Sequence, residues 1–269
     1  MSRNNKRNII RFLPVYGCIA TGIVYATIGV IAILSFLRIR HGGADESSML
    51  VILTSYVVGR IFIWVILLGT VCYIIWRFYE TIKDPYEYGN KITGLAKRTG
   101  IALSTIADVL IVYAAIRVLT GTSHVRPDGQ PYAERQTVSI LMQNYGAWLV
   151  IGIGAIYIVT AAIQFLYGVT RGYKERVNIG HLSPFFRNGV HVLAWIGYFG
   201  RGIILGITGF FLLKAGLIED PRYVVNTDKA FDFIGDNLGP VCFIFTATAT
   251  VCYGFFMLIQ GAIYDIDKD

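Results

Sequence analysis

Residues 59–80 read GRIFIWVILLGTVCYIIWRFYE, and residues 239–260 read GPVCFIFTATATVCYGFFMLIQ. Both stretches begin at a glycine and carry the tetrapeptide Thr-Val-Cys-Tyr at the same offset. Each is preceded, 42 positions earlier, by another glycine that stands in an apolar run, Gly17 in the first case and Gly197 in the second. Self-similarity of this kind predicts that the chain is built from repeated structural units.

A weaker middle copy lies between these two, with Gly100 and Gly146 standing 46 positions apart. We therefore expect a single membrane domain over residues 1–269, in which a two-helix unit occurs three times. The three copies span 13–85, 96–170 and 190–265. Because each copy has an even number of helices, successive copies run in the same direction, and parallel repeats are related by an axis along the membrane normal. Three such copies predict a pseudo-threefold bundle.

Composition places these helices in a membrane. The chain is 55% apolar and only 15% charged, with a mean hydropathy of +0.57, whereas soluble domains carry about 25% charged residues. A helix that crosses a bilayer needs about 20 residues. Six apolar stretches reach this length, at 14–37, 57–79, 100–119, 146–169, 190–213 and 239–263. The sequence therefore predicts an all-α integral membrane protein with six transmembrane helices.

The net charge of +7 is distributed unevenly along the chain. Lysine and arginine gather before the first predicted span and in the loops after the second and fourth spans. The loop before the last span is instead rich in acidic residues, namely Glu219, Asp220, Asp228, Asp232 and Asp236. This positive-inside bias predicts that both termini are cytoplasmic. It does not resemble the single basic face of a nucleic-acid-binding protein, so no nucleic-acid partner is expected.

Motifs of known chemistry are missing from the sequence. No nucleophile elbow, metalloprotease motif, phosphate loop or dinucleotide fingerprint occurs in a supporting context. We therefore expect no cofactor, no metal and no catalytic residue, and an enzyme is the least favoured class. His191, near the cytoplasmic end of the fifth span, is typical of a hydrogen-bonded residue at a helix interface.

The second helix of the first copy ends in aromatic and charged residues. Trp76 and Tyr79 are typical of side chains that anchor a span among lipid headgroups. Arg77 is expected to extend to the phosphates and Glu80 to lie in water.

Two ionisable residues are predicted deep in the bilayer, where a charge is costly and marks a candidate functional site. Arg201 lies near the middle of the fifth span and Asp108 near the middle of the third. When the copies are aligned on their first glycines, the two residues are offset by one helical turn, about 6 Å. We predict that Asp108 and Arg201 face the bundle interior and pair, directly or through water. Such a pair either fixes helix orientation or forms part of a binding or proton-relay site.

The aligned positions in the other copies are also polar. Thr21 and Ser104 match Arg201, and Tyr25 matches Asp108. A polar layer at a repeat interface is where transporters place their sites. We therefore expect the protein to bind or move a small solute, ion or lipid through a polar mid-membrane centre. The alternative is a structural or accessory subunit of a larger membrane complex, which a dry centre and a broad outer face of small residues would favour.

The chain resembles the bacterial membrane proteins grouped as domain-of-unknown-function family 1206 (DUF1206), in which a two-helix unit recurs three times. The residues that carry the resemblance are Gly17, Gly22, Tyr25, Gly59, Tyr73, Trp76, Arg77, Asp84 and Pro85 in copy one, and Gly197, Arg201, Gly202, Gly239 and Tyr253 in copy three. Thr21 departs from the family, which often has arginine there, and Thr105 replaces the second glycine in copy two. The resemblance implies the architecture of a multi-pass bacterial membrane protein, and we expect it in the cytoplasmic (inner) membrane with the lipid bilayer as its surroundings. The accessory-subunit alternative makes a membrane protein a candidate partner. The resemblance implies no assigned activity.

Overall fold

The computed structural model describes residues 3–38, 43–54, 57–84, 88–89, 91–121, 132–175 and 183–263. The long helices in these ranges are α1 (Arg3–Phe36), α3 (Val57–Lys83), α4 (Ile92–Leu119), α6 (Ala147–Thr170), α7 (Pro184–Ile218) and α9 (Pro240–Ala262). The short helices are α2 (Glu46–Thr54), α5 (Tyr132–Tyr145) and α8 (Thr227–Leu238), with 3₁₀ turns η1 (Gly172–Glu175) and η2 (Pro221–Tyr223). All regular secondary structure in the described residues is helical, which confirms the predicted all-α class.

Five of the long helices are long and apolar enough to cross a membrane, by length and composition. They are Phe12–Phe36 within α1, Gly59–Lys83 within α3, and the whole of α6, α7 and α9. The span predicted at 100–119 falls in α4, where several side chains lie outside the described part of the structure. The described residues therefore contain five candidate membrane spans, and the sixth span remains a prediction.

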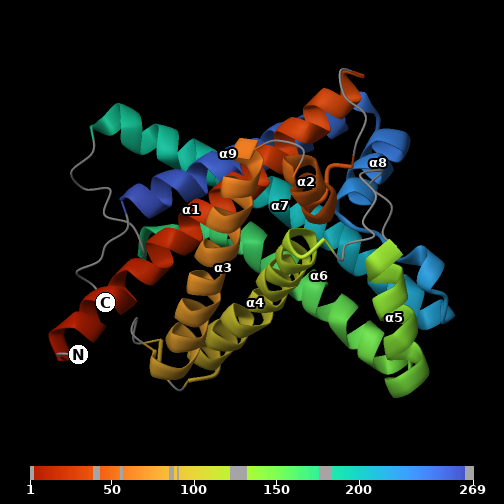
Figure 1. Ribbon diagram of the computed structural model, residues 1–269, viewed down its shortest axis with the longest axis horizontal. Helices are drawn as coiled ribbons and strands as arrows, with labels where there is room; N and C mark the ends of the chain where they lie inside the picture. The colour runs from red at the N-terminus through yellow and green to blue at the C-terminus, as the bar shows by residue number, and fades with distance from the viewer. Residues whose placement is uncertain are drawn as a thin grey trace.

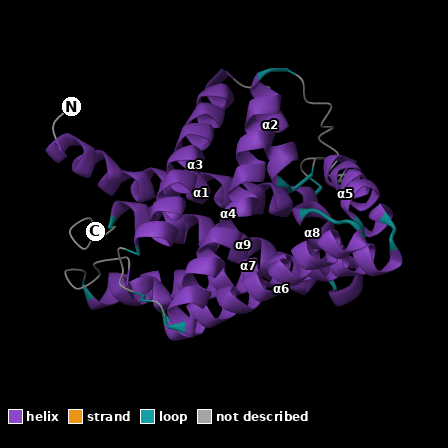
Figure 2. Ribbon diagram, turned by 90° about the horizontal axis from the view of Figure 1, so that it is seen from below, coloured by secondary structure: helices purple, strands orange, loops and turns teal. Residues whose placement is uncertain are grey.

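The long helices contact one another in chain order. α1 packs on α3, α3 on α4, α6 on α7 and α7 on α9, while α4 makes a smaller contact with α6. The last helix, α9, returns to pack along the first, α1, and Figure 1 shows the two lying side by side. Figures 1 and 2 show α2, α5 and α8 on the side away from the two chain ends. We call that side the outer end, and the end where α1 begins and α9 stops the terminal end.

In copies one and three, the first glycine allows the two helices to approach closely. A Cβ on Gly197 would lie 2.6 Å from the Cα of Tyr253, and a Cβ on Gly17 would overlap the side chain of Tyr73. The two glycines thus meet the same residue of the Thr-Val-Cys-Tyr tetrapeptide in their own copies. Close approach of this kind supplies the van der Waals contact that holds helices together in lipid, where the surroundings are as apolar as the side chains.

A second pair of glycines sets the contact between copies. A Cβ on Gly29 would lie 2.8 Å from the backbone nitrogen of Val251, and one on Gly209 would lie 3.0 Å from that of Ile158. Gly29 and Gly209 are each 12 residues after the first glycine of their copy, and Val251 and Ile158 are each 12 residues after the glycine that precedes their helix. The contact of α1 with α9 is therefore equivalent to the contact of α7 with α6.

An apolar cluster fills the outer half of the bundle. It includes Val24, Ile28, Ile63, Ile66, Ala115, Ile204 and Ala247 from α1, α3, α4, α7 and α9, with Met49 and Leu50 of α2 and Phe231 and Ile234 of α8. The short helices α2 and α8 cover the end of this cluster, because each buries its apolar side chains against it. The outer half of the described bundle is therefore packed with hydrocarbon side chains.

Asp228 links the outer segments of the first and third copies. Its Oδ1 accepts a hydrogen bond of 2.6 Å from the backbone N–H of Ala44, at the start of the α2 segment. Burial raises the pKa of Asp228 to about 7. The neighbouring carboxylates of Asp232 and Asp45 also raise this pKa, whereas the hydrogen bond from Ala44 and the charge of Lys229 lower it. This link should therefore respond to pH.

We expect Asp228→Asn to reduce the pH dependence of stability. Because its folded pKa lies above the ordinary value of 3.8, the folded state binds more protons than the unfolded state between about pH 4 and pH 7, and stability is lost as the pH rises through this range. Asparagine keeps an oxygen for the Ala44 N–H, so the variant should lack this loss, which is at most about 4 kcal/mol. Melting curves from pH 5 to pH 8 measure it, with Asp236→Asn as an exposed control. Parallel pH profiles of the wild type and Asp228→Asn would contradict the assignment.

Candidate polar site at membrane depth

Arg201 lies at the midpoint of the 35-residue helix α7. Its Nη1 donates a hydrogen bond to the hydroxyl of Tyr253 on α9. Its Cζ lies 4.5 Å from the ring centroid of Tyr25 on α1 and 4.8 Å from that of Tyr253. The two tyrosine rings meet edge to face at 5.2 Å. Three helices from the first and third copies therefore converge on one guanidinium group.

This arrangement suits a cation in a medium of low dielectric. Tyr253 is buried, so its ring and hydroxyl act on the guanidinium with little screening by water. A cation over a desolvated aromatic face gains about 2 kcal/mol, and the hydroxyl oxygen accepts a charge-assisted hydrogen bond. The site can therefore hold a positive charge at a depth where an unsolvated charge would be strongly disfavoured.

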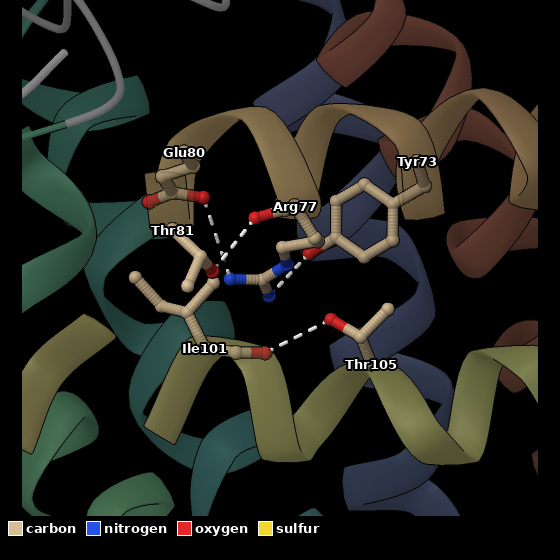
Figure 3. Close-up of polar contacts among 6 residues, drawn as sticks. All are labelled: Tyr73, Arg77, Glu80, Thr81, Ile101 and Thr105. Carbon is tan, nitrogen blue, oxygen red and sulfur yellow. Dashed lines mark hydrogen bonds and ion pairs between the residues drawn. The ribbon is translucent and has the colours of Figure 1, made fainter. Parts of the chain in front are cut away.

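The equivalent tyrosine of the first copy also binds an arginine. Arg77 follows Tyr73 by one turn on α3, donates from Nη2 to the Tyr73 hydroxyl at 2.5 Å and lies 4.7 Å from its ring centroid. Its Nη1 lies 3.7 Å from Oε2 of Glu80, whose side chain is 1% exposed. Figure 3 shows the guanidinium of Arg77 between Tyr73 and Glu80, facing the turn of α4 that carries Ile101 and Thr105.

These contacts correct the sequence interpretation of the end of α3. Trp76 is 2% exposed and Glu80 1%, so they do not reach headgroups and water as expected, and Arg77 points into the bundle rather than to the phosphates. The reason is that α4 packs across this end of α3. The four-residue spacing of Tyr73 and Arg77, which places both on one helix face, was the signal that could have revealed the cluster.

The two copies supply their arginines from different helices. Copy one has Arg77 and Glu80 where copy three has Met257 and Gln260, each 180 positions later. Conversely, copy three has Arg201 where copy one has Thr21. In both of these copies an arginine is hydrogen-bonded to the hydroxyl of the tetrapeptide tyrosine. That arginine comes from the second helix in copy one and from the first helix in copy three.

Of the five predicted site residues, the structure brings Tyr25 and Arg201 together. Thr21 is buried on α1, one turn before Tyr25. Ser104 and Asp108 belong to α4, but their side chains lie outside the described part of the structure. The ion pair between Asp108 and Arg201 therefore remains a prediction. Among the described residues, no group of three or more His, Cys, Asp and Glu side chains is placed to hold a metal ion.

Comparison with known proteins gives a family and no activity. The uncharacterized protein YxxB of Bacillus subtilis (strain 168) is 27% identical to this chain over 248 residues, which cover 91% of this chain and 88% of that protein. No solved structure matches the chain. The family described as Domain of Unknown Function (DUF1206) matches residues 16–84 and 196–263, about half of the chain. These are the first and third copies, which carry both tyrosine–arginine clusters. The chain therefore belongs to the DUF1206 family.

Proposed function

We propose that this protein binds or moves a small polar solute, an ion or a lipid through a polar centre at mid-membrane depth. The observation that carries the proposal is Arg201, which sits at the midpoint of a membrane-length helix and is contacted by Tyr253 and Tyr25 from two other helices. Ionisable residues at this depth are rare in membrane proteins and commonly mark ligand or ion pathways.

The proposal includes six spans, three parallel copies about a pseudo-threefold axis, and cytoplasmic termini in a bacterial inner membrane. The equivalent glycine contacts of α1 with α9 and of α7 with α6 support the threefold relation. A threefold axis that relates these two contacts would also place α4 against α3, and α3 and α4 are in contact. The exposed cations Lys83, Lys91, Arg171, Lys174 and Arg187 lie at the terminal end, which supports placing that end in the cytoplasm.

The apolar cluster of the outer half favours a binding site over an open pore. Hydrocarbon side chains from α1, α3, α4, α7 and α9 meet there under α2 and α8, and a hydrophobic constriction opposes the passage of ions. The tyrosine–arginine clusters lie nearer to the terminal end than this apolar cluster does. We therefore propose that a ligand reaches the centre from the terminal end, and that release at the outer end would need the cluster to separate.

Asp108 is the proposed acidic member of this centre. It lies eight residues after the first glycine of its copy, as Tyr25 does. Tyr25 contacts Arg201 and also Tyr253 of α9. Under the proposed threefold relation, Asp108 would lie correspondingly near Tyr73 and Arg77 on the neighbouring helix α3. Two partners are therefore proposed for its carboxylate, Arg201 across the centre and Arg77 beside it.

Native mass spectrometry of the full-length protein in mild detergent tests the proposed binding. We expect the wild type to carry a non-protein mass that Arg201→Met loses, because methionine keeps the apolar stem without the cation. Asp108→Asn should weaken retention of the same mass, and Val159→Met, on the exposed face of α6, is the control that should retain it. Melting curves verify that each variant is folded. If the wild type carried no adduct and melted at the same temperature as Arg201→Met, the proposed binding site at Arg201 would be wrong.

The alternative role, as a structural or accessory subunit, has one observation in its favour. Gly152, Ala155 and Ala162 are exposed on α6, and a Cβ on Gly152 would meet no atom within 4 Å. Small residues on an outer helix face favour close contact with another helix in lipid. A stoichiometric protein partner in the same mass spectra, lost when Gly152 is replaced by leucine, would support this role.

A further inference from the structure

The junction of α6 and α7 at the terminal end is held by a buried tyrosine. Tyr173 of η1 is 1% exposed, and its hydroxyl is hydrogen-bonded to Nδ1 of His191 on α7 at 2.7 Å. Its ring packs against Tyr198 and Phe256 at centroid distances of 6.1 and 5.2 Å. His191 is thus the hydrogen-bonded interface residue that the sequence predicts, and the pair fixes η1 against α7.

Three cations gather around this pair. The charges of Lys174, Arg171 and Arg187 all act on His191, and that of Arg171 acts on Tyr173. All three side chains are exposed. None of them forms an ion pair with a carboxylate in the part of the chain that the structure describes. A concentrated positive potential therefore faces outward at one point of the terminal end.

The surface next to these cations, toward the bilayer centre, is aromatic. Arg187, His191 and Trp195 follow one another at four-residue spacing and so share one face of α7. The ring of Trp195, a residue that is 46% exposed, stacks on Phe199 at 5.4 Å. Phe199 in turn meets Phe165 of α6 edge to face at 4.8 Å. The face therefore joins a cationic rim to an aromatic wall that spans α6 and α7.

We propose that this surface, formed by Arg171, Lys174, Arg187 and Trp195, binds an anionic phospholipid. The headgroup phosphate would lie among the three cations, and an acyl chain would lie against Trp195 and Phe199. Basic groups between transmembrane helices suit anionic headgroups, and the adjoining aromatic wall suits a hydrocarbon chain rather than a soluble anion. The surface is separate from the polar centre around Arg201, so the inference does not rest on the proposed function.

Lipid titration of delipidated full-length protein tests the inference. Phosphatidylglycerol or phosphatidylcholine is added in dodecyl maltoside, and bound lipid is counted by native mass spectrometry. The wild type should bind phosphatidylglycerol more tightly than phosphatidylcholine. Arg171→Gln/Arg187→Gln should weaken phosphatidylglycerol binding by about 30-fold and leave phosphatidylcholine binding unchanged. Lys83→Gln/Lys91→Gln, which removes the same charge from exposed sites at the end of α3 and just before α4, is the matched control and should bind as the wild type does.

Further measurements separate the lipid from a soluble anion. Trp195→Ala should weaken binding of phosphatidylglycerol but not of glycerol phosphate, since only the lipid has a chain to place on the ring. Melting temperatures confirm that the variants, all at exposed positions, remain folded. Equal affinities for the two lipids, equal losses in the two double variants, or displacement of phosphatidylglycerol by inorganic phosphate at matching concentration would each overturn the proposal.

Discussion

Gly254→Leu should prevent the protein from folding into a stable bundle. A Cβ at Gly254 would lie 2.7 Å from both the Cα and the Cβ of Ala26 on α1. The clash is with the backbone of α1, so a change of side-chain rotamer cannot relieve it. The contact of α9 with α1 joins the last helix to the first. Overpacking in a core typically costs 1–3 kcal/mol, and a clash with backbone exceeds that. We expect loss of the monodisperse peak in size-exclusion chromatography, and a lowered melting temperature even for Gly254→Ala.

Gly152→Leu is the matched control for this substitution. Gly152 is also a glycine within a membrane-length helix, but a Cβ there would meet no atom within 4 Å. The variant should elute and melt as the wild type does, apart from any effect on an external partner. If Gly254→Leu behaved in the same way as Gly152→Leu, the close contact of α1 with α9 would be wrong.

The repeated glycines were enough to predict much of the fold. Gly146 and Gly239 stand directly before α6 and α9, whereas α1, α4 and α7 begin well before the first glycines of their copies. The spacing also aligns Gly17 with Gly197, which occupy the same place against Tyr73 and Tyr253. Which helices become neighbours across copies could not be derived in this way. The contact of Gly29 with α9 joins residues more than 200 positions apart, and no local pattern of either segment encodes its partner.

The candidate site was predictable only in part, for a related reason. A residue's place along a span indicates its depth, and this was sufficient to select Arg201 and to align Tyr25 with the same layer. Depth does not indicate whether a neighbouring helix covers the residue. Arg77 and Glu80 therefore looked like interfacial groups, whereas α4 packs on α3, Glu80 is buried and Arg77 is only 14% exposed.

Glu80→Ala should destabilise the protein by about 3–5 kcal/mol, the usual cost of removing one partner of a buried ion pair. The substitution removes the carboxylate that lies 3.7 Å from Nη1 of Arg77, and the two side chains are 1% and 14% exposed, respectively. Arg77→Met/Glu80→Gln should recover most of this loss, because it installs the residues that copy three has at the equivalent positions, Met257 and Gln260. Equilibrium unfolding in detergent, followed by tryptophan fluorescence, measures both variants.

Adding Thr21→Arg to that double variant tests whether the two arrangements are interchangeable. The new guanidinium would approach the Tyr73 hydroxyl from α1, as Arg201 approaches that of Tyr253 from α7. The triple variant should therefore be at least as stable as the double variant. Thr21→Arg alone should be less stable than either, because it sets a second cation beside Arg77 in a medium that screens repulsion poorly. If the triple variant and Thr21→Arg alone were equally destabilised, the two clusters would be unrelated features. They would then not be two ways of meeting the same requirement, which is a single positive charge beside each tetrapeptide tyrosine.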